Sequence, residues 1–92
     1  MLTELQARNA KAESKVYRLK DEAGLYLEVR PSGKKVWRMR YWIAGRERIL
    51  TFGDYPLFSL KEARDRRDIA RRIIADGGDP AEKWAEERAA VK

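Results

Sequence analysis

The segment KKVWRMRYW, residues 34–42, alternates between apolar side chains and arginines. A β-strand has a period of two residues, so alternate side chains lie on the same face of a sheet. One face of this strand would carry the large apolar side chains of Trp37, Met39 and Tyr41. The other face would carry Arg38, Arg40 and Trp42. The segment therefore predicts a strand with one face in a hydrophobic core and one basic face.

Two more segments alternate in the same way, one on each side of this strand. They are LYLEVR, residues 25–30, and RILTF, residues 48–52. The sequences between them, PSG at 31–33 and AGR at 44–46, have the composition of reverse turns. Connections this short make neighbouring strands antiparallel, so the three strands should form a meander. Residues 16–19 form only a short extended run before it.

Helices are predicted at both ends of this sheet. Thr3 can cap a short helix over residues 3–11, and Ser59 with Glu62 matches a capping box for a helix that reaches about Asp76. The apolar stripe of the second helix consists of Leu60, Ala63, Ile69, Ala70, Ile73 and Ile74. One helix with one stripe covers one face of a sheet. The predicted fold is therefore α+β: a three-stranded antiparallel meander packed on one face by a C-terminal helix, with a short N-terminal helix.

The same reading divides the chain into a domain over residues 1–80 and a tail over residues 81–92. The tail has helical propensity but almost no apolar face apart from Trp84. We expect it to be a linker, or the start of a missing downstream domain.

The face that the helix leaves open should be strongly basic. It would carry Tyr26, Glu28, Arg30, Arg38, Arg40, Trp42, Ile49 and Thr51. Between Glu28 and Arg48 there are seven basic and two acidic residues, which accounts for most of the net charge of +6. Such a surface favours a polyanion as partner. Ion pairs of Glu28 with Arg38 or Arg40 are an alternative explanation for part of this pattern.

Composition excludes several classes of function. The chain has no cysteine and no histidine, so it has no disulfide, no thiolate metal site and no histidine base. No acid–base pair or nucleophile with a base is visible, so we expect neither an enzyme nor a cofactor. No apolar run approaches the ~20 residues of a membrane span. A soluble, intracellular protein without a membrane partner is expected.

Double-stranded DNA fits the predicted open face. Three strands span about 10 Å, and the major groove of B-DNA is about 12 Å wide. Arg38 and Arg40 could fork onto guanine, while Lys34, Lys35 and Arg46 at the hairpin ends could meet phosphates. Two alternatives stay open: an RNA-binding sheet that stacks bases on its aromatic side chains, and a protein-interaction module that uses the sheet edges or residues 81–92.

Three motifs together resemble a known family. GLYLEV, VWRMRY and GDYP followed by SLKEAR are similar to the N-terminal arm-type DNA-binding domain of phage and genomic-island integrases, which are tyrosine recombinases. The resemblance covers about residues 2–80. It implies sequence-specific binding of duplex DNA at arm-type sites in the bacterial cytoplasm, in a recombinase whose catalytic domain this chain lacks. Contacts with other integrase protomers or accessory proteins would belong to the full-length assembly.

The resemblance places the first candidates on the predicted strands: Arg30, Arg38, Arg40, Trp42 and Thr51. With the basic residues expected at phosphates, the complete set of candidate DNA-binding residues is Arg30, Lys34, Lys35, Arg38, Arg40, Trp42, Arg46, Arg48 and Thr51.

Overall fold

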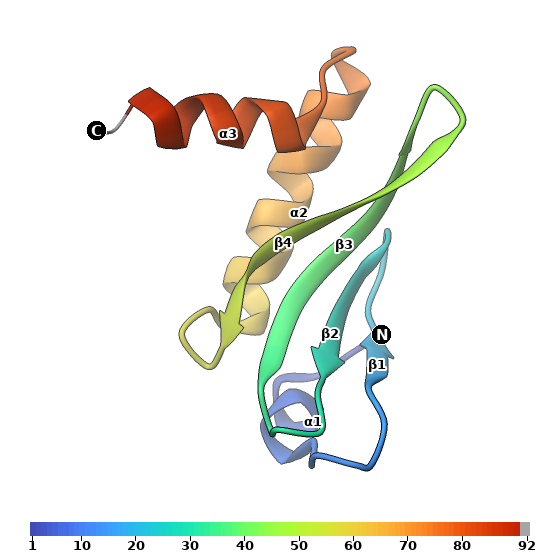
Figure 1. Ribbon diagram of the computed structural model, residues 1–92, viewed down its shortest axis with the longest axis vertical. Coiled ribbons are helices and arrows are strands. Elements are labelled where there is room, and N and C mark those ends of the chain that lie inside the picture. The colour runs from blue at the N-terminus through green and yellow to red at the C-terminus, as the bar shows by residue number, and fades with distance from the viewer. Residues whose placement is uncertain (91–92) are drawn as a thin grey trace.

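The computed structural model describes the backbone of residues 1–90 and the side chains of residues 1–86. Its elements are α1 (Glu4–Asn9), β1 (Tyr17–Lys20), β2 (Leu25–Val29), β3 (Lys35–Ile43), β4 (Arg46–Tyr55), α2 (Leu60–Ala75) and α3 (Pro80–Ala90). In Figure 1, α2 runs behind the sheet, α1 lies near the β2–β3 turn, and α3 extends from the far end of α2. The α+β class is confirmed. None of the described helices is long and apolar enough to cross a membrane.

The sheet has four antiparallel strands in the order β1-β2-β3-β4, so the prediction of three strands was wrong. The additional strand is β1, which pairs with β2 from Tyr17 opposite Val29 to Lys20 opposite Tyr26. A tight turn returns the chain, and within it the Asp21 N–H donates to the Leu25 carbonyl at 2.8 Å. Because β2 would otherwise leave one edge of backbone groups unpaired, even a four-residue strand satisfies donors and acceptors there.

Gly24 in this turn ties the β1–β2 end of the sheet to β3. Its carbonyl accepts a hydrogen bond from the Arg40 N–H at 2.9 Å. Its φ of +84° is a conformation that glycine adopts readily, and a Cβ here would lie 2.2 Å from the Arg40 carbonyl oxygen. A side chain at this position would therefore push the turn away from β3.

The core fills the space between the sheet and α2. Trp37 is completely buried and its Nε1–H donates to the Phe58 carbonyl at 2.7 Å. Around it pack Leu25, Leu27 and Val29 of β2, and Leu60 and Ala63 of α2. A second cluster joins Met39, Tyr41 and Leu50 to Ala70 of α2. The predicted inward face of β3 is thereby confirmed.

The helix α2 begins at the predicted Ser59–Glu62 capping box. Its buried stripe differs from the prediction, because Ile69 is 53% exposed while the Arg67 side chain is only 12% exposed. Arg67 donates to Asp21, whose side chain is completely buried. A buried carboxylate needs cationic donors, and the contact with Asp21 gives Arg67 a partner on the covered side of α2.

Asp21 is the centre of a polar clamp. Its carboxylate accepts hydrogen bonds from the Leu2 N–H, from Nε and Nη2 of Arg64, and from Arg67. Burial alone would raise the pKa of Asp21, but the hydrogen bonds from Arg64 and Leu2 outweigh it and lower the pKa to about 2. This one anion fixes the N-terminal segment, the end of β1 and α2 relative to one another.

The segment predicted as a tail is helical as far as Ala90, and residues 91–92 lie outside the described part. Trp84 meets Phe52 edge to face with ring centroids 5.8 Å apart. Asp79, which precedes α3, accepts from the Tyr41 hydroxyl at 2.8 Å and from the Ala81 N–H at 2.9 Å. The start of α3 is therefore packed on the sheet, while the proposed boundary after residue 80 stays a prediction.

Candidate nucleic-acid interface

One face of the sheet is not covered by α2. The pairing register places on it Arg18 and Lys20 of β1, Tyr26 and Glu28 of β2, Val36, Arg38, Arg40 and Trp42 of β3, and Glu47, Ile49, Thr51 and Asp54 of β4. We call this surface the open face. Because the register of β3 matches the sequence alternation, the predicted separation of Trp37 from Arg38 is confirmed. Arg30 follows β2 directly and its guanidinium also reaches Glu28.

Glu28 holds two arginines of the open face. Its side chain is 8% exposed and accepts from Arg30 Nε at 2.9 Å and from Arg38 Nη1 at 3.2 Å. Arg38 Nε also donates to the Thr51 hydroxyl at 3.2 Å. A guanidinium has five N–H donors, so Arg38 is held at two of them and keeps others for a ligand.

The charge of Glu28 persists despite its burial. Burial alone would raise its pKa, but hydrogen bonds from Arg30 and Arg38 outweigh it and lower the pKa. Glu28 is therefore an anion that fixes the positions of two cations.

Arg40 has a different environment at the more exposed end of the face. Its Nε and Nη2 donate to the two carboxylate oxygens of Glu47 at 3.1 and 3.0 Å. The guanidinium also lies 5.5 Å from the ring centroid of Trp42, which is 55% exposed. This end of the face thus presents a cation beside a large apolar surface.

The remaining candidates lie elsewhere. Lys34 is exposed in the β2–β3 turn, 3.8 Å from Asp54, and Arg46 is exposed at the start of β4. Lys35 and Arg48 share the parity of the covered face. The Lys35 ammonium donates to the carbonyls of Ala7 and Arg8 at the end of α1, and Arg48 pairs with Asp79 at 3.3 Å.

The sequence prediction missed Arg18 and Lys20 as part of this surface. The Arg18 guanidinium lies 5.0 Å from the centroid of the Tyr26 ring. Tyr17 and Leu19 alternate with these two cations, as expected for a strand. Four residues give this pattern too few repeats to identify a strand from the sequence. Tyr26 is only 2% exposed, so it offers no free ring for stacking an RNA base.

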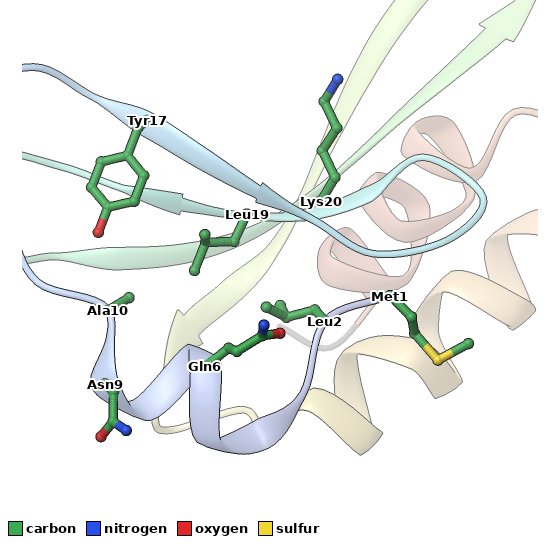
Figure 2. Close-up of a pocket in the computed structure, with 8 residues that line it drawn as sticks. All are labelled: Met1, Leu2, Gln6, Asn9, Ala10, Tyr17, Leu19 and Lys20. Carbon is green, nitrogen blue, oxygen red and sulfur yellow. The ribbon is translucent and has the colours of Figure 1, made fainter.

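A hollow lies between β1 and α1 on the covered side, and Figure 2 shows its lining. Tyr17 and Leu19 point toward α1, while Lys20 points away. Its lining combines the apolar side chains of Met1, Leu2, Ala10 and Leu19 with the polar groups of Gln6, Asn9, Tyr17 and Lys20, and this set holds no carboxylate. Among the described residues, no three acidic, histidine or cysteine side chains are grouped so as to ligate a metal.

The family model and the similar proteins agree on one family for this chain. The model of a family described as Arm DNA-binding domain matches residues 2–87. Over 80 residues the chain is 56% identical both to an integrase of Shigella phage Sf6 and to the prophage integrase IntS of Escherichia coli. It is 45% identical over 82 residues to the E. coli prophage integrase IntZ. These alignments cover 87% of this chain but only 20–21% of each relative, so the chain spans about a fifth of their length.

Proposed function

The chain belongs to the Arm DNA-binding domain family, and from that premise we propose that it binds duplex DNA sequence-specifically through the open face of its sheet. The proposed ligand is an arm-type site, and β3 lies along the major groove. The relatives are named integrases, so the parent protein is proposed to be a tyrosine recombinase of prophage or genomic-island integration and excision. Strand exchange would then be the task of its other domains.

The observation that carries this proposal is the presentation of Arg38 and Arg40 from one strand, on the face opposite α2. Arginine can donate two parallel hydrogen bonds to O6 and N7 of guanine in the major groove. The hydrogen bond from Arg38 to Thr51 and its ion pair with Glu28 support this use, because they orient the guanidinium before DNA arrives.

The other candidates take different roles in this interface. Trp42 has an exposed ring that suits a thymine methyl or a sugar. Lys34 and Arg46 would meet phosphates from the two ends of β3. Lys35 and Arg48 are engaged on the covered side, so the proposal gives them a role in stability rather than in base contact.

The test compares two arginines that each pair with one carboxylate. A duplex is first selected from random oligonucleotides with the wild-type domain. Arg40→Ala should then weaken binding to this duplex about 5- to 150-fold, equivalent to ~1–3 kcal/mol for one bidentate base contact, and weaken scrambled duplex much less. Arg72→Ala is the control, because Arg72 pairs with Asp76 on α2 and its side chain is 81% exposed.

Equal effects of Arg40→Ala and Arg72→Ala on the selected duplex would refute the proposed binding mode. Single-stranded RNA is included as a competitor. Displacement of the selected duplex by an equal concentration of RNA would support the RNA-binding alternative instead.

A further inference from the structure

We propose that β1 completes a pocket on the open face that holds one phosphodiester group of the DNA backbone. This inference rests on the proposed function and adds a site to it. The pocket lies where β1, β2 and the middle of β3 meet, and its lining is Arg18, Lys20, Asp21, Gly24, Leu25, Tyr26, Arg40 and Trp42.

The chemistry of the lining selects an anion. The cations of the lining, Arg18, Lys20 and Arg40, only donate hydrogen bonds, and three donors around one space suit the several acceptor oxygens of a phosphodiester. The one carboxylate in the wall belongs to Asp21, whose side chain is completely buried and already accepts from Arg64 and Arg67. The pocket is therefore a set of donors around a positively charged space.

Two of these cations are available to an external partner. Arg30, Arg38 and Arg40 each have a carboxylate partner on the open face. Within residues 1–86, whose side chains are described, no ion pair is formed by Arg18 or Lys20. The Tyr26 ring beside Arg18 carries no charge, so the positive charges of Arg18 and Lys20 are the ones that an incoming phosphate can neutralise.

The hydroxyl of Tyr26 adds an independent observation. It is buried and has no hydrogen-bond partner among the described residues, although Tyr26 lines the pocket. Buried hydroxyls in native proteins are nearly always paired, and an unpaired one needs an explanation. A phosphate oxygen in the pocket would supply the missing acceptor after a small movement of the side chains that cover this hydroxyl.

The width of the sheet places this pocket at the edge of the groove. Four strands enclose three gaps of about 4.8 Å, a span of about 14 Å, and the major groove is about 12 Å wide. If β3 lies in the groove, one edge strand must meet the sugar–phosphate backbone. β1 is an edge strand, and its outward side chains are the cations Arg18 and Lys20.

The first experiment measures how Kd depends on salt for Arg18→Ala and Lys20→Ala, with Arg72→Ala and Lys61→Ala on α2 as charge-matched controls. Loss of a phosphate contact should reduce the slope of log affinity against log salt by about 0.9. It should also weaken selected and scrambled duplexes by the same factor. An unchanged slope for Arg18→Ala, or a loss confined to the selected duplex, would overturn the phosphate assignment.

The second experiment removes the charge from the DNA instead. Neutral methylphosphonates are placed one at a time along the selected duplex. One position should weaken wild-type binding but cause no further loss in Arg18→Ala, and additive losses at every position would overturn the proposal. Tyr26→Phe should weaken binding about 2- to 10-fold, the effect of one hydrogen bond, without lowering Tm. If these variants bind normally while Arg40→Ala loses selectivity, the pocket is wrong and the proposed function stands; if Arg40→Ala also binds normally, both fail.

Discussion

Two glutamates on the open face should have opposite effects on DNA binding although they carry the same charge. Glu28 is buried between Arg30 and Arg38, and Glu47 is a half-exposed partner of Arg40. Glu28→Gln and Glu47→Gln keep side-chain length and remove the same charge from the same surface. If only net charge mattered, both substitutions would strengthen binding equally.

Replacing Glu47 should strengthen binding. Its carboxylate occupies Nε and Nη2 of Arg40, an edge of the guanidinium that could otherwise fork onto guanine. Both side chains are about 40% exposed, so the pair is worth only ~0.2–1 kcal/mol. DNA must displace that interaction, and its loss should therefore improve affinity by about 1.5- to 5-fold.

Replacing Glu28 should weaken binding. Its carboxylate orients Arg38 from a site that is 8% exposed, and glutamine retains one acceptor oxygen without the charge. Hydrogen bonds to charged groups contribute ~1.5–3 kcal/mol each, so we expect an unfolding free energy lower by about that amount. With Arg38 less constrained, discrimination between selected and scrambled duplex should fall about 5-fold or more.

The assay is fluorescence anisotropy with both duplexes at one salt concentration, after urea unfolding has shown that each variant is folded under those conditions. The expected pattern is a gain for Glu47→Gln and a loss of selectivity for Glu28→Gln. Equal gains for both variants on both duplexes would refute the idea that these carboxylates act through the positions of arginines.

Three further predictions concern stability. Trp37→Ala should lower the unfolding free energy, measured by urea denaturation, by about 3–5 kcal/mol, because it opens a cavity and leaves the Phe58 carbonyl unpaired. A loss under 1 kcal/mol would contradict the buried position of Trp37. Asp21 has a folded pKa of about 2 against an ordinary 3.8, so it should contribute about 2 kcal/mol above pH 4 that disappears as pH falls toward 2. Unfolding measured across this range should lose that dependence in Asp21→Asn, and an identical pH profile would show that the clamp is not the cause. Trp84→Ala should remove an edge-to-face pair with Phe52 worth ~0.5–1.5 kcal/mol and lower Tm by several degrees in a thermal scan. An unchanged Tm would mean that the contact of Trp84 adds no stability to the domain.

Local sequence signals were sufficient for the centre of this fold. The alternation across Trp37 and Arg38 assigned each side chain to its face, because a strand of nine residues gives that pattern several repeats. The Ser59–Glu62 capping box located the start of α2 for a similar reason, since both of its hydrogen bonds join residues three apart.

The features of the fold that the sequence did not predict depend on contacts between residues that are distant in the sequence. β1 could not be identified from four residues, because its existence depends on the free edge of β2. The inward position of Arg67 depends on Asp21, which is 46 residues away in the sequence. Ile69 was assigned to the buried stripe because periodicity records polarity and not packing, and its side chain is 53% exposed. The packing of Trp84 on Phe52 could not be predicted from the sequence either, because α3 has no apolar stripe that would indicate a buried face.

The ion pairs of the open face were an alternative to DNA binding at the sequence level, and in the structure the two readings are compatible. Glu28 and Glu47 share the open face with five cations, which are Arg18, Lys20, Arg30, Arg38 and Arg40, while the charge of Asp54 at the edge is balanced by Lys34. Three positive charges therefore remain uncompensated, and two of the five cations, on β1, have no ion-pair partner within residues 1–86. A face selected only for solubility would have little reason to bury a glutamate that fixes two arginines. Such an arrangement suits a surface whose central cations must be held in place while those at its edge are free to find phosphate.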